Sequence, residues 1–289
     1  MDLTTAIQTA ANAGAASCMY AMIAVGLSLA FGVMQMANYA HGEFFMAGAY
    51  TVYAMYALGG MPYWAAIAAG AGIVAVLGLA VERGIFRPTR GNVLAGFMAT
   101  AGLAFIIQVF VGEVYGWGLM RYIPKPYMIP FEFLGASVDF TRILIIPAAV
   151  ASIGGLIFFM RRFKLGQALR AVAQDPEIAS IQGISIGKIT ALAMGIAGGL
   201  AGFAGGLMST IYAVTPTLGH QVILPAFIVV IVGGMGSVEG AVLASVIFGF
   251  AHTFVTTVFD AVVANMVVVA IMAIVLIIRP QGIMGRVAV

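Results

Sequence analysis

Apolar runs separated by short polar breaks extend along the whole chain. The longest of them approach the roughly 20 helical residues that cross a hydrocarbon core. Several runs are shorter than a full crossing, so some helices are expected to be broken or re-entrant. The pattern predicts an all-α, polytopic transmembrane helix bundle with about eight to ten membrane segments. The apolar runs cover residues 10–36, 44–58, 62–81, 93–112, 143–160, 190–213, 222–234, 238–259 and 262–278.

Composition excludes a soluble fold. Hydrophobic residues make up 63% of the chain and charged residues 8%, with a mean hydropathy of +1.10. A soluble domain carries about 25% charged residues. The two longest hydrophilic stretches, 113–142 and 161–189, are too short to form an independent core. Residues 1–289 are therefore predicted to form a single transmembrane domain.

Basic residues are concentrated in three segments. By the positive-inside rule these segments face the cytoplasm, which places the C-terminus there. The loop 113–142 and the N-terminus are then expected outside. The net charge of +3 reports this topology, and we expect membrane lipid rather than nucleic acid as a partner. The segments contain Arg83, Arg87 and Arg90; Arg161, Arg162, Lys164, Arg170 and Lys188; and Arg279 and Arg286.

Two polar, glycine-bearing breaks interrupt the apolar runs, one in each half of the chain. The first is NYAHGE at 38–43 and the second is GGMGSVEG at 233–240. Ionisable groups at membrane depth are costly unless they face protein or water, and paired breaks indicate a transporter's binding or gating region. The alternative is that both are tight interfacial loops. The candidate translocation-path residues are Asn38, His41, Glu43, Gly234, Ser237 and Glu239.

Other polar side chains in the apolar runs are more simply explained by packing. We expect His252 and Asp260 to form interhelical hydrogen bonds or to lie at helix ends. The alternative is that they belong to a proton relay. Cys18 is expected to be a small buried hydrophobe, and a single cysteine permits neither an intrachain disulfide nor a cysteine-based zinc site. The remaining polar residues of this kind are Gln108, Thr253, Thr256, Thr257 and Asn265.

The stretch 165–184 predicts two short helices in a cytoplasmic loop. Leu165, Leu169 and Val172 recur at helical spacing. Asp175 then offers an N-cap, with Pro176 and Glu177 in the first turn and Gly183 at the end. The second helix would present a small face (Ala179, Ser180) and two isoleucines (Ile178, Ile181). It is either a rigid element that docks on a partner or a solvated connector.

The sequence does not predict an enzyme or a cofactor site. Residues 183–190 have three residues between two glycines where a phosphate loop needs four, and Ile189 stands where a magnesium-binding hydroxyl is required. A membrane hydrolase using Ser237 and His252 is disfavoured. A helix would separate the pair by about 22 Å, whereas a nucleophile and its base need about 3 Å. His41 remains as a base from elsewhere in the chain.

Four motifs occur in order along most of the chain. They are residues 26–50, 165–171 (LGQALRA), 233–237 (GGMGS) and 279–285 (RPQGIMG). Together they resemble the LivH-type permeases of the branched-chain amino-acid importers, which belong to the ATP-binding-cassette class. The stretch 165–184 is similar to the cytoplasmic loop by which such permeases engage their ATPases. The resemblance assigns ATPase coupling to Leu165, Gly166, Leu169, Arg170, Ala171, Asp175, Pro176, Glu177, Ala179 and Gly183.

The resemblance also implies partners and a substrate class. A second, LivM-type permease, two cytoplasmic ATPase subunits that hold ATP and magnesium, and a periplasmic amino-acid-binding protein would complete the importer in a bacterial inner membrane. The substrate would be a branched-chain amino acid. The alternatives are urea or short-chain amides, or an ion-coupled carrier that works without ATPases. Gly166→Trp or Ala179→Arg is expected to uncouple ATP hydrolysis from uptake.

Overall fold

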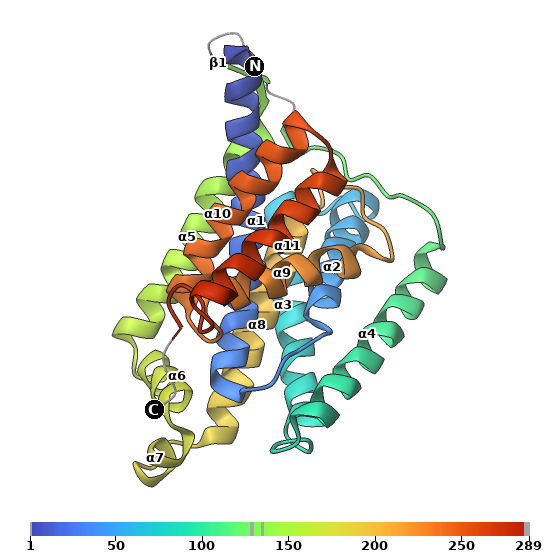
Figure 1. The fold of residues 1–289 in the computed structure, drawn as a ribbon. Helices are drawn as coiled ribbons and strands as arrows, with labels where there is room; N and C mark the ends of the chain where they lie inside the picture. Colours follow the sequence, from blue (N-terminus) through green and yellow to red (C-terminus); the bar gives the residue numbers. More distant parts are fainter. Residues whose placement is uncertain (1, 128–129, 134–135, 286–289) are drawn as a thin grey trace.

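The computed structural model describes residues 2–127, 130–133 and 136–285, and it confirms an all-α helical bundle (Figure 1). Among these residues, seven helices are long and apolar enough to cross a membrane, and α9 is a shorter apolar helix. The elements are α1 (Leu3–Met34), α2 (His41–Val52), the π-helical turn η1 (Tyr53–Leu58), α3 (Tyr63–Val81), the π-helical turn η2 (Glu82–Phe86), α4 (Val93–Tyr115), β1 (Pro130–Phe133), β2 (Ala136–Asp139), α5 (Phe140–Arg162), α6 (Lys164–Gln174), α7 (Pro176–Ile181), α8 (Ile186–Met208), α9 (Leu218–Gly233), α10 (Val238–Val258) and α11 (Ala261–Ile278).

Each predicted apolar run coincides with a helix, and the differences are in the ends. The first helix begins at Leu3 rather than at residue 10, and α8 ends at Met208 rather than at residue 213. The residues from Leu3 to Thr9 include polar side chains that lower hydropathy without opposing a helix. Hydropathy therefore located the helices but not their exact limits.

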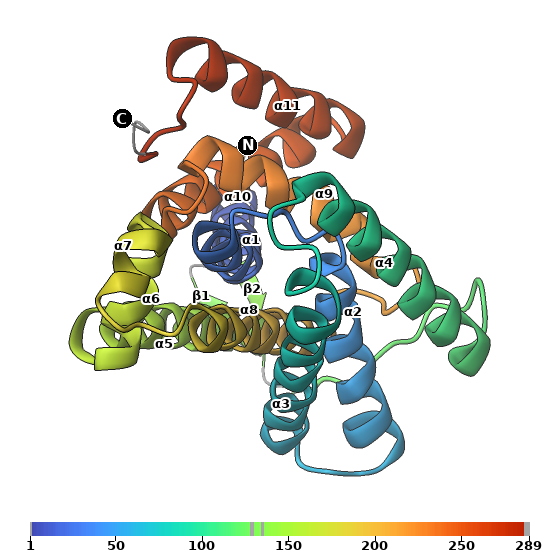
Figure 2. The same ribbon diagram turned by 90° about the horizontal axis from the view of Figure 1, so that it is seen from below.

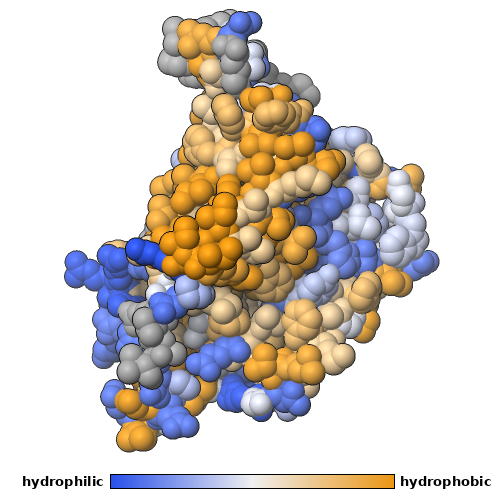
Figure 3. Space-filling view, in the orientation of Figure 1, coloured by the Kyte–Doolittle hydropathy of each residue, from blue (hydrophilic) through white to orange (hydrophobic). Residues whose placement is uncertain are grey.

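Helix α1 runs through the centre of the bundle, and the peripheral helices surround it (Figures 1 and 2). It packs against α10, α8, α5 and α9. The most apolar window of α1 is 78% buried, whereas that of α4 is 17% buried and that of α11 is 11% buried. Figure 3 shows the resulting hydrophobic surface over α10 and α11. The exposed apolar faces of α4 and α11 therefore suit lipid or another membrane subunit.

Glycine contacts bring α2, α3 and α8 together. A Cβ at Gly48 of α2 would overlap the backbone of Gly202 in α8, and a Cβ at Gly198 would meet the carbonyl of Val74 in α3. Such close backbone approach is how membrane helices pack in the absence of a hydrophobic driving force between them. These contacts make α3 and α8 a tightly packed pair.

The two ends of the bundle differ in structure and charge. The N-terminal end carries a small antiparallel hairpin of β1 and β2, inside the loop predicted to face outward. The other end carries α6 and α7 (Figure 1). The three basic segments lie at the end of α6 and α7, as the predicted orientation requires, although Arg286 lies outside the described residues.

Candidate functional site

The predicted break between the first two helices is buried inside the bundle. Helix α1 ends at Met34, Gln35 adopts a left-handed conformation with φ 54°, and α2 begins at His41. Asn38 and His41 are fully buried, and Glu43 is 2% exposed. We call residues 38–43 the buried break. Its polar groups face protein rather than headgroup water, so it differs from a loop at the membrane surface.

Several polar atoms of the buried break have no hydrogen-bond partner among the described residues. The Asn38 Oδ1 accepts from the Ala40 amide at 3.1 Å, and the His41 Nε2 lies 3.2 Å from the Ile23 carbonyl oxygen. The Asn38 Nδ2, the His41 Nδ1 and one carboxylate oxygen of Glu43 are buried without a partner. Buried unpaired polar groups are rare because they lose their hydration without compensation. Their concentration here marks a place suited to a polar molecule.

His220, in the first turn of α9, connects the buried break to α4. Its Nε2 lies 3.9 Å from a Glu43 carboxylate oxygen and 3.1 Å from the Gln108 Oε1. Its Nδ1 lies 3.4 Å from the hydroxyl of Tyr39, whose amide donates to the Thr100 hydroxyl at 3.2 Å. Gln108 thus makes the interhelical hydrogen bond predicted for the polar residues of the apolar runs. The cluster joins α2, α4 and α9.

Two glycines allow α2 and α9 to meet at this cluster. A Cβ at Gly42 would overlap the Gly219 carbonyl and Ile223, and a Cβ at Gly219 would overlap the Glu43 carboxylate. The helix starts therefore touch backbone to backbone. Glu43 is held directly against α9.

The second predicted break has a different environment. We call residues 233–240 the end turn because it joins α9 to α10 at the end that carries α6 and α7. Gly234 and Gly236 adopt positive φ of 102° and 83°, and the Ser237 hydroxyl accepts from the Gly240 amide at 3.0 Å as the N-cap of α10. Glu239 pairs with Arg161 at 3.4 Å, and its side chain is 52% exposed. The end turn matches the alternative of a tight loop.

The structure does not bring the two sets of path candidates together. The buried break touches the first turn of α9 at Gly219, and the end turn begins at the last residue of that helix, Gly233. At 1.5 Å per residue, α9 separates these points by about 21 Å. Among the described residues, the groove lined by Ser237 and Glu239 includes none of residues 38–43.

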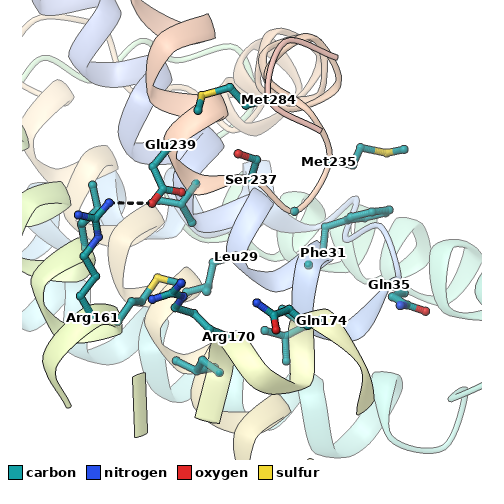
Figure 4. A pocket seen from close by; sticks show the side chains of 18 residues that line it. Leu29, Phe31, Gln35, Arg161, Arg170, Gln174, Met235, Ser237, Glu239 and Met284 are labelled. Atoms are coloured by element: carbon teal, nitrogen blue, oxygen red, sulfur yellow. Dashed lines mark hydrogen bonds and ion pairs between the residues drawn. The ribbon is translucent and has the colours of Figure 1, made fainter. Parts of the chain in front are cut away.

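The end turn instead faces the stretch 165–184, which we call the coupling loop, across a groove of about 680 Å³ (Figure 4). The groove brings Ser237 and Glu239 together with Leu169 and Arg170 of α6. Its other walls come from the last turn of α1, the end of α5 and Met284. Predicted members of the path set and of the coupling set therefore meet at this end of the molecule.

The coupling loop has the two helices predicted for it. The Asp175 carboxylate accepts from the amides of Glu177 and Ile178 at 2.8 and 2.9 Å and caps α7, and Gly183 follows the helix with φ 82°. Arg170, Glu177 and Leu165 are exposed, whereas Ala171 and Pro176 are half-buried. The first turn of α6 is tight because a Cβ at Gly166 would overlap the backbone of Phe159 and Met160.

Helix α7 does not present Ala179, part of its expected small face, to the outside. Ala179 is 3% exposed and faces the bundle, where α7 packs mainly on α6 and also touches α8. Ile178 is 55% exposed and Ile181 is 85% exposed. The surface open to a partner is therefore the isoleucine face. Gly166 and Ala179 hold the loop together, and their substitution would disturb its fold.

The polar residues of the last helices have structural positions. Asp260 caps α11 by accepting from the amides of Val262 and Val263 at 2.7 and 2.9 Å. The ring of His252 lies 6.4 Å from that of Tyr20. Ser237 caps the start of α10, and His252 lies fifteen residues further along this helix, about 22 Å away at 1.5 Å per residue.

Comparison with known proteins places the chain in a family. A family model described as "Branched-chain amino acid transport system / permease component" matches residues 10–278. The chain belongs to this permease family. It is 32% identical to the high-affinity branched-chain amino acid transport system permease protein BraD of Pseudomonas aeruginosa, over 92% of each chain. It is 31% identical to LivH of Salmonella typhimurium, over 92% of this chain and 91% of that one.

More distant relatives agree on the fold. This permease is 24% identical to LivM of Salmonella typhimurium, over 92% of this chain and 67% of the relative. A solved structure, PsaBC from Streptococcus pneumoniae in complex with Fab, is 16% identical with a TM-score of 0.50 and covers 93% of this chain and 91% of that one. At this identity the likeness extends to the fold alone.

Sequence reasoning missed His220 in this permease. The predicted apolar run began at residue 222, so His220 fell in the preceding loop. A signal was nonetheless present, because α2 begins with His41 and Gly42 and α9 begins near Gly219 and His220. A histidine beside a glycine at the start of two apolar helices could have paired these segments.

Proposed function

We propose that this permease is the membrane-spanning subunit of an ATP-driven, binding-protein-dependent importer of branched-chain amino acids. The observation that carries the proposal is the match to BraD and LivH over 92% of this chain, because both names describe high-affinity branched-chain amino acid transport. The chain is a transport subunit and not an enzyme.

The proposed complex contains a second, LivM-type permease, two ATPase subunits and a periplasmic amino-acid-binding protein. The likeness to both LivH and LivM supports the pairing of two related permeases. ATP and magnesium would be held by the ATPase subunits. The basic end with α6 and α7 would face the cytoplasm of a bacterium, together with the C-terminus. The binding protein would dock at the opposite end, on the loop 113–142.

Coupling is proposed to begin at the isoleucine face of α7. Ile178 and Ile181 are exposed apolar side chains on a helix that Asp175 caps, so they suit a groove on an ATPase. ATP binding would close the ATPase pair and displace α7. Helix α8 would follow because it contacts both α7 and α6. The bundle would then alternate between two packing arrangements, each favoured by one state of the partners.

The buried break is proposed to contact the solute. An amino acid has two charged groups and, in this class, an apolar side chain. Glu43 and His220 offer polar contacts inside an otherwise apolar bundle, and the ring of Phe105 lies 5.8 Å from that of His220. Such a mixture of few polar groups and many apolar ones is typical of small-molecule sites.

The test is Ile181→Arg in the reconstituted complex, with uptake of labelled leucine and ATP hydrolysis measured in the same vesicles. Uptake should fall at least about tenfold, as for loss of an interface anchor, while membrane insertion is retained. Gln182→Arg is the matched control, because it adds the same charge at the neighbouring exposed position. Equal uptake by Ile181→Arg and wild type would contradict docking through this face.

Two further measurements address the class of transporter and the substrate. Uptake that persists in vesicles without any ATPase subunit would identify an ion-coupled carrier instead. Calorimetry of the partner binding protein against leucine, isoleucine, valine and urea should give tight binding to the amino acids. Binding of urea alone would indicate that the permease belongs to an importer of urea or short-chain amides.

A further inference from the structure

A fully buried carboxylate lies at the corner between α3 and α4. Glu82, the first residue of η2, is 0% exposed, although its neighbour Arg83 is exposed. The Thr190 hydroxyl donates to the Glu82 carboxylate at 2.8 Å, and guanidinium nitrogens of Arg90 and Arg87 lie 3.5 and 3.7 Å from it. A buried carboxylate persists only when it is paired and hydrogen-bonded. The Glu82 Oε1 meets that requirement, and Oε2 has the Arg87 ion pair but no hydrogen bond among the described residues.

The same bonds join segments that are far apart in the sequence. Arg90 donates to the Thr190 hydroxyl at 2.9 Å, and Arg87 donates to the Gly187 carbonyl at 3.4 Å. Gly187 and Thr190 lie in the first turns of α8, which follows α7 after a short connection. The cluster therefore ties the α3–α4 corner to the part of α8 nearest the coupling loop.

This cluster lies at one end of the tightly packed seam between α3 and α8. Above it, a Cβ at Gly78 of α3 would overlap the Met194 carbonyl of α8, so the two helices are already in backbone contact. Helix α4 has no such seam, because its most apolar window is 17% buried. The corner held by Glu82 is thus one of the places where α4 is attached to the rest of the bundle, because η2 contacts α4 there.

Helix α4 continues from this corner to the buried break. Its Thr100 accepts from the Tyr39 amide, and its Gln108 lies 3.1 Å from His220. The described residues therefore form a continuous chain of contacts from α7 through α8, Glu82 and α4 to the candidate solute site. Contiguity of this kind becomes a coupling only when one end is shown to bias the other.

We infer that Glu82 is a positioning residue that locks the α3–α4 corner to α8, so that displacement of α7 reaches α4 and the buried break. The inference rests on the proposed function for the source of the displacement. Glu82 itself touches neither ATP nor solute. Its role is to make two segments move as one body.

The first test is Glu82→Gln in the reconstituted complex, with leucine uptake and ATP hydrolysis measured together. Glutamine keeps the size and an acceptor for Thr190 but removes the charge that holds both arginines. Uptake per ATP hydrolysed should fall by about fivefold or more, the lower range of coupling between sites. Arg83→Gln is the matched control, since Arg83 is exposed and has no ion pair among the described residues. A parallel loss of uptake, hydrolysis and protein abundance would indicate a structural role only, and an unchanged ratio would overturn the inference.

The second test requires no transport. Nitroxide labels at Arg83 and Gln182, both exposed, would be placed in a Cys18→Ala background, and their distance distribution measured by pulsed electron resonance. Wild type should give a narrow distribution that is the same with and without nucleotide, and Glu82→Gln a broader one. A nucleotide-dependent change in wild type as large as that in Glu82→Gln would overturn the positioning role of Glu82 even if ATP-driven uptake holds. Absence of ATP-driven uptake in wild type would instead count against the proposed function.

Discussion

The buried break and the end turn have similar sequences and opposite environments. Each contains at least one glycine and one carboxylate between apolar runs, yet Glu43 is 2% exposed and the Glu239 side chain is 52% exposed. The chain enters the buried break through the non-helical residues 35–37, which lead back into the bundle before α2 begins. The end turn joins α9 to α10 at the end of the bundle, where the connecting residues reach the surface. Composition therefore marks an interruption, and the path of the chain decides its depth.

The two regions also differ in how their polar groups are paired. In the end turn, Ser237 caps a helix and Glu239 has an arginine partner. The amides of Ile283 and Met284 donate to the Val232 and Gly233 carbonyls at 2.7 and 3.0 Å. In the buried break, three polar atoms remain unpaired. A surface turn can complete its hydrogen bonds locally, whereas a buried segment that keeps unpaired groups is the better candidate for binding.

The largest expected effect comes from adding a methyl group to the tight contact between α2 and α9. Gly42→Ala would place a Cβ against the Gly219 carbonyl and Ile223, and overpacking of this kind costs about 1–3 kcal/mol or more. The unfolding midpoint in detergent should fall. Gly102→Ala is the control, because a Cβ there meets nothing within 4 Å and helix propensity favours alanine by up to about 1 kcal/mol. Equal midpoints for the two variants would mean that the break is not packed as described.

The next effect concerns the two carboxylates. Glu43→Gln should lower ATP-driven leucine uptake by about tenfold or more, equivalent to about 1.4 kcal/mol, because it replaces the buried carboxyl group beside His220 with an amide. Glu239→Gln breaks an exposed ion pair worth about 0.2–1 kcal/mol, so uptake should change by less than about fivefold. The measurement is initial uptake rate at matched protein abundance. A larger loss for Glu239→Gln would reverse the assignment of the path.

The fold was largely predictable, because membrane helices are recorded in hydropathy. Every expected apolar run became a helix, and Asp175 and Gly183 delimited α7 as predicted. These features depend on residues close together in the sequence, where local rules apply. The charge clusters likewise placed the three basic segments at one end.

The candidate site was less predictable, because it depends on contacts between distant segments. Nothing local indicates that His220 reaches Glu43 and Gln108, or that Glu82 meets Thr190 across 108 residues. Ala179 was expected on a docking face, and only its burial in the folded chain shows that it faces inward. Local patterns indicate which residues are unusual, and tertiary contacts decide their roles.

A smaller effect on stability should show whether Ser237 only caps α10 or also contacts the solute. Ser237→Ala removes the hydroxyl that accepts from the Gly240 amide, and loss of an N-cap costs about 0.5–2 kcal/mol. The unfolding midpoint should fall modestly, with no change in the concentration of leucine that half-saturates uptake. Ser237→Asp should restore the midpoint because aspartate is an equally good cap. A change in half-saturation for Ser237→Ala would instead bring the end turn into the solute path.

The smallest effect is expected for the ion pair between Arg161 and Glu239. The side chains are 63% and 52% exposed, so solvent screens their attraction, and a double-mutant cycle with Arg161→Gln and Glu239→Gln should give a coupling energy below about 1 kcal/mol. Because exposed charges are screened within about 3 Å at 1 M salt, the coupling should vanish there. A coupling that persists in salt would mean that the complex buries this pair. The end turn would then resemble the buried break more closely than the isolated subunit indicates, and the groove beside α6 would be part of a subunit contact.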